Sequence, residues 1–342
     1  MKVLYPYWLL ALGLGLWGWS GCHKAPARPA APPVPAAATN FPASQVDPSL
    51  PPNESLFQGA RAFRDLERQV EMGPRSVGSP GAEQLRLWLQ RELHGLGYKT
   101  GAQVFTAQTP LGPKKMFNIL AWAPLASPAT QANTIILSTH HDTKYFTDFT
   151  FVGANDGASG VALLLELARV FKERPLTKHN LLFAFWDGEE ALQEWSAEDS
   201  LYGSRHFVES LDTPQTPFKL TTKQIVAVIN MDMVGDRHLQ VTYDTLSHPQ
   251  LLEMLFTKGR DLRFEKNFKR AELGNIADDH LPFLQRSIPA INLIGFNQTG
   301  AGSYPPYWHT AEDTLDKVSA TSLQIAGSTV DLLVRDLDRI LE

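Results

Sequence analysis

The chain has 342 residues, of which 43% are hydrophobic and 20% charged, and this composition excludes disorder throughout, a collagen-like repeat and a coiled coil. Lysine and arginine number 31 against 36 for aspartate and glutamate, a net charge of -5, so the overall charge does not favour nucleic acid as a partner. The single cysteine, Cys22, excludes an intramolecular disulfide and a zinc site built from several thiolates.

Residues 1–22 have the pattern of a secretory signal, because Lys2 precedes an uncharged apolar run that ends in small residues. The run is short for a membrane-spanning helix, which needs about 20 apolar residues, although an uncleaved anchor is the alternative. Its end, Ser20-Gly21-Cys22, resembles the lipobox of bacterial lipoproteins, in which the cysteine is acylated. The sequence therefore predicts an exported protein that is tethered to the membrane by acylated Cys22, on the periplasmic or extracellular side.

Residues 23–52 are predicted to form a tether. Ten of the 24 prolines of the chain lie in the first 52 residues, and the segment contains mainly alanine and proline with almost no large apolar side chain. Such a segment cannot bury a core and is expected to be an extended, semi-rigid spacer. Since no second linker of this kind follows, residues 53–342 are predicted to form one catalytic domain.

The hydrophobic pattern of this domain predicts alternating helices and strands. Helical spacing is found in residues 55–72, 82–96, 160–173, 204–211, 249–262 and 319–341. Strand-like apolar runs occupy residues 114–124, 133–142, 180–187, 225–234, 238–243 and 288–296. This alternation predicts an α/β fold, a single domain with a mostly parallel central sheet that is covered by helices on both faces.

Three of the predicted strands end in polar side chains that can bind a metal. The side chains are His140, His141 and Asp142 after the first of these strands, Asp187, Glu189 and Glu190 after the second, and Asp232 and Asp236 after the third. In such sheets the active site lies at the carboxyl ends of the strands. A solvated loop would seldom place carboxylates directly after apolar strands three times.

Without thiolates, a metal site in this chain must use nitrogen and oxygen ligands, and such a set suits zinc with an open position for substrate. The candidates are Asp156 in GANDGASG, the pair Glu189-Glu190, and His309 in YWHTAEDT. Adjacent glutamates on an irregular loop point in different directions. One of the pair can therefore bind the metal while the other transfers protons.

Five segments are distinctive when taken together: STHHDTKYF, FVGANDGASG, DGEEALQEWSAEDSLYGSRH, DDHLPFLQR and YWHT. They closely resemble segments of the animal-type glutaminyl cyclases, which are single-zinc enzymes related in fold to the zinc aminopeptidases. The resemblance runs in order from GPRSVGSPG to the final helix. It implies a zinc-aminopeptidase-like (phosphorylase/hydrolase-like) architecture and one bound Zn²⁺. The implied activity is conversion of the N-terminal Gln of peptides or proteins to pyroglutamate with release of ammonia.

The resemblance also implies roles for individual residues. The zinc ligands would be Asp156, Glu190 and His309, with Glu189 as the general acid/base. Asp278 and Asp232 would support catalysis by hydrogen bonding, and Trp195, Trp308 and Tyr304 would line the substrate pocket. Two departures from the animal pattern affect only substrate fit and loop rigidity: Ala277 replaces an amide side chain, and Thr139 stands where animal enzymes can have half of a disulfide.

The main alternative is a di-zinc aminopeptidase that hydrolyses N-terminal residues. In that case His140 and Asp232 would hold a second metal, Asp156 would bridge the two ions, and Glu189 would activate water. The long loop that contains Trp195 favours the cyclase. A tethered binding module without turnover is a weaker alternative, because no ligand of the predicted site is missing.

Two further polar residues, Asp313 and Lys144, are interpreted as having no part in the chemistry. Asp313 is expected to help close a loop, and Lys144 is interpreted as a solvated loop charge. The sequence does not predict the oligomeric state.

Overall fold

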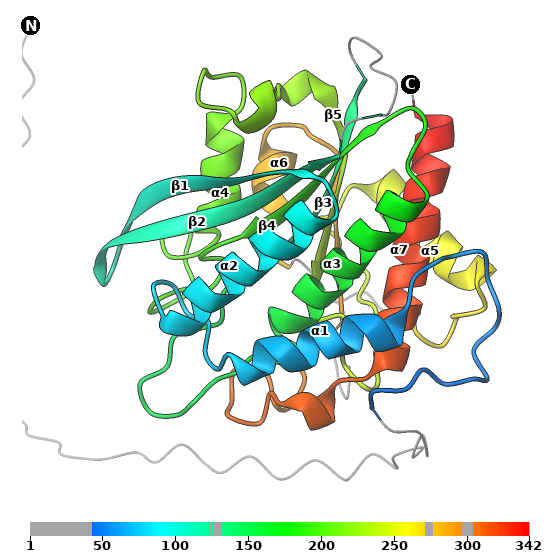
Figure 1. Ribbon diagram of the computed structural model, residues 1–342, viewed down its shortest axis with the longest axis horizontal. Helices are drawn as coiled ribbons and strands as arrows, with labels where there is room; N and C mark the ends of the chain where they lie inside the picture. Colours follow the sequence, from blue (N-terminus) through cyan, green and yellow to red (C-terminus); the bar gives the residue numbers. More distant parts are fainter. Residues whose placement is uncertain (1–42, 124, 126–131, 271–275, 296–303, 342) are drawn as a thin grey trace, which may run out of the picture. The chain divides into compact units, whose positions relative to one another are not determined.

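The computed structural model describes residues 43–123, 125, 132–270, 276–295 and 304–341. The helices are α1 (Gly59–Glu71), α2 (Pro80–Gly95), α3 (Ala158–Glu173), α4 (Tyr202–Ser210), α5 (Pro249–Asp261), α6 (Leu281–Gln285) and α7 (Ala320–Ile340). The strands are β1 (Lys99–Thr109), β2 (Gly112–Ala123), β3 (Thr134–His140), β4 (Asn180–Trp186), β5 (Ile225–Asp232) and β6 (Ala290–Ile294). Figure 1 shows how these elements are arranged.

The strands form one sheet in the order β1-β2-β4-β3-β5-β6. Strands β4, β3, β5 and β6 are neighbours and run parallel to one another. Strands β1 and β2 form an antiparallel hairpin, which extends the sheet beyond β4 because β2 pairs antiparallel with β4. Because β4, β3, β5 and β6 are parallel neighbours, their carboxyl ends meet at one edge of the sheet. The predicted mostly parallel sheet is therefore confirmed.

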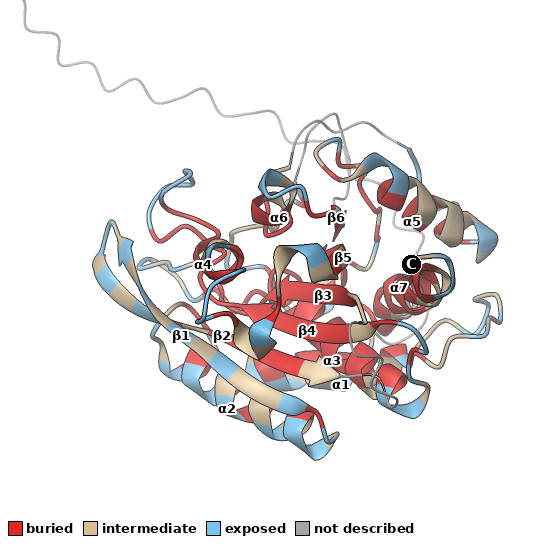
Figure 2. Cartoon of the chain, turned by 90° about the horizontal axis from the view of Figure 1, so that it is seen from above, coloured by how far each residue is buried: buried red, intermediate tan, exposed pale blue. Residues whose placement is uncertain are grey.

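Helices cover both faces of this sheet, as predicted (Figure 2). Successive residues of β4 alternate between two hydrophobic clusters, with Leu181, Phe183 and Phe185 in one and Leu182, Ala184 and Trp186 in the other. The first cluster also contains apolar residues of α1, α2, α3, α5 and α7, and the second contains residues of α4 and α6. Burial on both faces explains why these strands are continuous apolar runs in the sequence.

The sequence missed one strand, and one of its strand predictions was wrong. Strand β1 is half exposed along its length, and its Thr, Gln and Gly residues do not form an apolar run, so the sequence did not predict it. Residues 238–243 were predicted to form a strand, but they form isolated bridges, one of them between Val241 and Gly295, and no strand. The backbone NH of Thr242 donates to the carbonyl of Ile294 on β6, but that of Val241 donates to the carbonyl of Asn267, so the segment forms no continuous ladder with the sheet.

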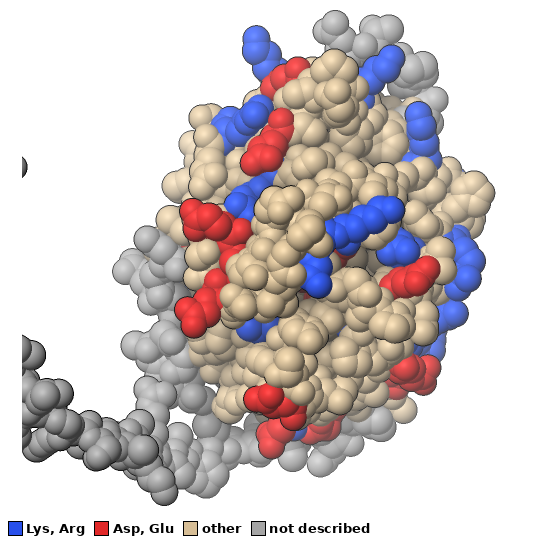
Figure 3. All heavy atoms as spheres, turned by 90° about the vertical axis from the view of Figure 1, so that its left-hand side faces the viewer, with Lys and Arg blue, Asp and Glu red and all other residues tan. Residues whose placement is uncertain are grey.

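The predicted signal, Cys22 and most of the predicted tether lie outside the described residues, so these assignments stay predictions. The last part of the tether contacts the domain: the Ala43 carbonyl accepts from the amide of Ala320 at 2.7 Å, and Leu50 packs against the main core. Among the described residues, no helix has the length and apolar character needed to cross a membrane. Figure 3 shows acidic and basic side chains interspersed on the face that it displays.

Candidate active site

The predicted convergence of polar residues at the sheet edge is confirmed. His140 is the last residue of β3 and Asp232 the last of β5, while Glu189 and Glu190 follow β4 by three and four residues. All four side chains are buried, and the last three of them line one cavity of about 530 Å³. The topology therefore brings groups from three strands into one site.

The Glu189-Glu190 pair lies on a tight turn that begins at Gly188. Gly188 has φ +70°, and a Cβ at this position would lie 2.8 Å from Sδ of Met116, so the turn requires glycine. The carboxylate of Asp142 accepts from the backbone NH groups of Glu189 at 3.1 Å and Glu190 at 3.3 Å. Asp142 thus orients both glutamates, a role that the sequence did not assign to it.

Asp156, Glu190 and His309 form the first group that could hold a metal. Nε2 of His309 lies 3.0 Å from Oε1 of Glu190 and 3.2 Å from Oδ2 of Asp156. Around a tetrahedral zinc ion with bonds of about 2.0–2.2 Å, neighbouring ligand atoms are about 3.3 Å apart. The three predicted ligands therefore have the donor atoms and the spacing that one ion requires, with one atom of each within 4.8 Å of the others.

The loop that carries Asp156 is held by Asp313. The carboxylate of Asp313 accepts from the backbone NH groups of Asn155 at 2.8 Å and Asp156 at 3.0 Å, so Asp313 closes a loop as expected. Gly157 follows with φ +89°, and a Cβ there would lie 2.7 Å from the carbonyl oxygen of Asp142. This close approach of two loops sets where Asp156 enters the site.

The ring of His309 is held between aromatic side chains. The Trp308 ring stacks on it with centroids 3.7 Å apart, and the Phe151 ring forms a T-shaped pair with it, with centroids 5.9 Å apart. His309 has φ 54°, a conformation that a residue other than glycine adopts at an energetic cost. The aromatic packing therefore supports a strained backbone that directs the imidazole to Asp156 and Glu190.

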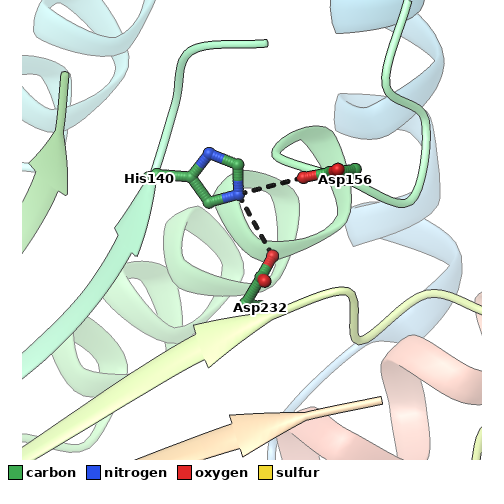
Figure 4. Close-up of side chains that lie close together, drawn as sticks. All are labelled: His140, Asp156 and Asp232. Carbon is green, nitrogen blue, oxygen red and sulfur yellow. Dashed lines mark hydrogen bonds and ion pairs between the residues drawn. The ribbon is translucent and has the colours of Figure 1, made fainter. Parts of the chain in front are cut away.

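His140, Asp156 and Asp232 form a second group that could hold a metal (Figure 4). Nε2 of His140 lies 3.1 Å from Oδ1 of Asp232 and 3.3 Å from Oδ1 of Asp156. Asp156 belongs to both groups through its two oxygens, which is the bridging arrangement of the aminopeptidase alternative. The geometry therefore keeps that alternative open.

Burial and neighbouring charges shift the pKa values of these groups. Burial raises the pKa of Glu189 well above its usual value, against the partial opposition of His140. Burial alone would lower the pKa of His309, but the carboxylates of Asp156 and Glu190 outweigh it and raise the pKa to about 9. Burial, assisted by the charge of Asp232, raises the pKa of Asp278 to about 6.

The cavity beside the metal groups contains all the predicted pocket residues. Trp195, Trp308, Tyr304 and Asp278 line it, together with Met233 and Ile276. The rings of Tyr304 and Trp308 stack with centroids 3.7 Å apart. Trp195 is 44% exposed, which places it at the rim rather than in the core. The cavity wall is thus mainly apolar and aromatic, and its carboxylates lie at the two groups of residues that could hold a metal. An apolar wall with a few placed polar groups is common in small-ligand sites.

The interpretation of Lys144 as a solvated charge was wrong. Its side chain is 15% exposed, and Nζ lies 3.6 Å from Oε2 of Glu190 and donates to the carbonyl of Ala191 at 3.0 Å. Lys144 therefore places a positive charge in the cavity wall beside Glu190. The fold brings Lys144 next to Glu190, which is distant in the sequence. The residues that follow Lys144, Tyr145 and Phe146, did not indicate this contact.

Comparisons with known proteins show which family and fold this chain is similar to. Residues 118–334 match the model of "Peptidase family M28". The chain is 34% identical over 273 residues to a glutaminyl-peptide cyclotransferase-like protein of Bos taurus, covering 70% of this chain and 66% of the relative. It is 32% identical over 285 residues to a glutaminyl-peptide cyclotransferase of Bothrops jararaca, covering 73% and 74%. The crystal structure of an Acidobacteriales bacterium glutaminyl cyclase superimposes with a TM-score of 0.74 at 35% identity, over 86% of this chain and 99% of that one.

Proposed function

Since the chain belongs to peptidase family M28 and, within it, to the glutaminyl-peptide cyclotransferases, we propose that it converts the N-terminal Gln of peptides or proteins to pyroglutamate with release of ammonia. The observation that carries the proposal is the three-ligand group Asp156, Glu190 and His309 beside a third carboxylate, that of Glu189, in one aromatic-walled cavity. A site of this kind can activate a carbonyl and move a proton within one bound residue.

The proposed cofactor is one zinc ion held by Asp156, Glu190 and His309. The donor types and their spacing fit zinc, and three protein ligands leave an open position for substrate. When bound, zinc supplies a Lewis acid that polarises the γ-carbonyl of the glutamine and stabilises the charge that develops on its oxygen.

The residues of the chain supply the proton transfers and the positioning. An N-terminal glutamine already contains its nucleophile, the α-amine, and its electrophile, the γ-amide, so the pocket need only fold the side chain back. Glu189 takes the proton from the attacking amine and returns one to the departing ammonia, a two-step role that its raised pKa favours. Asp278 and Asp232 lie in the cavity wall, where their carboxylates would accept hydrogen bonds from the substrate. The aromatic side chains of the wall exclude water around the folded glutamine.

The second candidate function is that of a di-zinc aminopeptidase. The group of His140, Asp156 and Asp232 favours it, because these residues would hold a second ion. The exposed Trp195 at the cavity rim and the stacked Tyr304–Trp308 pair favour the cyclase, since they give the cavity aromatic walls around a small side chain.

A direct assay separates the two functions. The full chain, loaded with zinc, is given a Gln-initiated peptide and, separately, a leucyl anilide. The cyclase predicts ammonia release from the first substrate and no cleavage of the second. Anilide cleavage without ammonia release would instead establish the aminopeptidase.

Zinc binding is expected to weaken as the pH falls from 8 to 6. In the metal-free protein His309 is protonated below a pKa of about 9, and zinc binds only the neutral imidazole, so binding must release this proton. Release of about one proton lowers the apparent affinity by about tenfold per pH unit, or about 100-fold over this range. Titration against a competing chelator at several pH values measures the slope. An affinity that is constant over this range would contradict the assignment of His309 as a ligand.

We further propose that the domain is exported and held at the membrane by an acylated Cys22. Support for this comes from the signal-like run of residues 1–22 and the alanine- and proline-rich segment that follows. Cys22→Ala is expected to move the protein from the membrane fraction to the soluble fraction after cell fractionation. Membrane association that survives this substitution would favour an uncleaved anchor.

A further inference from the structure

Two asparagines lie side by side on the paired strands β5 and β6, at buried positions where apolar side chains would be expected. Asn230 on β5 and Asn292 on β6 are directly opposite each other in the parallel register, and both are 0% exposed. Burying an amide costs free energy unless its hydrogen bonds are made. Their partners therefore indicate what these amides do.

Both amides donate to the carboxylate of Asp278. Nδ2 of Asn230 donates to Oδ1 of Asp278 at 3.0 Å and to Oδ1 of Asn292 at 3.2 Å. Nδ2 of Asn292 donates to Oδ2 of Asp278 at 2.6 Å. The three side chains thus form a closed ring of hydrogen bonds, which we call the amide ring, and each carboxylate oxygen of Asp278 is held by a different strand.

The orientation of the Asn230 amide is set from β3. Oγ of Ser138, which is opposite Asn230 in the register, donates to Oδ1 of Asn230 at 2.9 Å. If this amide were reversed, its oxygen would face the carboxylate of Asp278, which is also an acceptor. The hydroxyl therefore keeps the NH₂ group of Asn230 directed at Asp278.

Asp278 needs such support because it does not lie on a strand. It lies in the loop before the short helix α6, and it lines the cavity beside Glu189. Its own loop supplies one further bond, from the backbone NH of Asp279 at 2.5 Å. The amide ring connects this loop carboxylate to two paired strands of the sheet, β5 and β6.

We propose that Asn230 and Asn292 are positioning residues that hold the carboxylate of Asp278 at the cavity wall, where it accepts a hydrogen bond from the nitrogen groups of the substrate glutamine. The inference rests on the proposed function. Because the ring supplies donors to both oxygens of Asp278, the carboxylate meets the substrate only as an acceptor. An amine or an amide NH₂ suits that acceptor, whereas the carboxylate of an N-terminal glutamate would be repelled.

The test compares Asn230→Leu, Asn292→Leu and the control Asn180→Leu in the zinc-loaded full chain. Asn180, at the opposite end of β4, makes two side-chain hydrogen bonds that its leucine variant also loses. All three variants should lose thermal stability, and all should keep their zinc. Only the two ring variants should lose kcat/KM for Gln-initiated peptides, on the order of 100-fold, because a misplaced Asp278 no longer meets the reacting nitrogen.

A double-mutant cycle separates positioning from general destabilisation. If Asn230 acts through Asp278, Asn230→Leu should lower kcat/KM little further in an Asp278→Asn chain. An equal fold-loss in both backgrounds, or ring variants as active as the Asn180→Leu control, would overturn the proposal. The wild-type chain is measured in parallel: if it releases no ammonia the proposed function fails, whereas an active wild type with active ring variants refutes only the inference.

Discussion

Glu189→Gln is expected to lower kcat for Gln-initiated peptides by about 10²- to 10⁴-fold, the range that general acid–base catalysis supplies. The amide cannot take the proton of the attacking amine. Its shape matches the carboxylate, and the backbone NH of residue 189 still donates to Asp142, so the turn is preserved. Zinc content should therefore equal that of the wild-type chain. Ammonia release under saturating substrate and metal analysis of the same sample measure the two quantities.

The matched control is Glu194→Gln. Glu194 lines the same cavity five residues further along, but its side chain is exposed. The same chemical change at the rim should leave kcat within about twofold of the wild type, since surface substitutions away from the reacting atoms are usually mild. A Glu189→Gln enzyme that turns over at the rate of this control would exclude Glu189 as the proton carrier.

His309→Ala is expected to remove zinc from the chain and with it all turnover. The binding free energy of a structural zinc site is about 10–16 kcal/mol, which is about 3 kcal/mol for each of its four ligands. Loss of one ligand therefore lowers the zinc affinity by at least about 100-fold. The substitution also leaves the buried carboxylates of Asp156 and Glu190 facing each other without a cation between them, so the metal-free variant gains no compensating contact. Metal analysis after exhaustive dialysis is the measurement.

Two other histidines serve as comparisons in the same metal analysis. His206 on α4 stacks on Phe105 with centroids 4.2 Å apart, and His206→Ala should retain full zinc content. His140→Ala distinguishes the single-zinc site from the di-zinc site. The cyclase assignment predicts that this variant keeps the same zinc per chain as the wild type. A fall from two ions to one would establish the second metal site at His140, Asp156 and Asp232.

The sequence predicted those parts of the fold and site that depend on local pattern. Strands buried on both faces are continuous apolar runs, so β3, β4 and β5 were found, and the residues that follow them were correctly placed at one edge. Strand β1 was missed because only part of its surface is buried, and it therefore contains polar residues. Residues 238–243 have an apolar pattern, but they form no continuous ladder with the sheet: the NH of Thr242 donates to Ile294 at the end of β6, whereas that of Val241 donates to Asn267 outside it.

The orientation of site residues could not be read from the chain. Asp142 holds the two backbone NH groups of the glutamate pair from 47 and 48 residues away. Lys144 contacts Glu190 because two loops meet at the sheet edge, while its neighbours in sequence suggest a solvated position. Asn230 and Asn292 are 62 residues apart and bond only because β5 and β6 are paired.

The sequence by itself therefore determined the types of groups available: histidine and carboxylate ligands without thiolates, a glutamate pair after a buried strand, and aromatic residues beside them. These follow from residue identity and from the continuous apolar runs of strands that are buried on both faces. Only the tertiary structure decided which atoms meet, that Asp156 presents its two oxygens to two histidines, and that Asp278 is held by amides from two strands. Hydrogen bonds and metal ligation require separations of about 2–3 Å, and the packing of the whole sheet and its helices sets those separations.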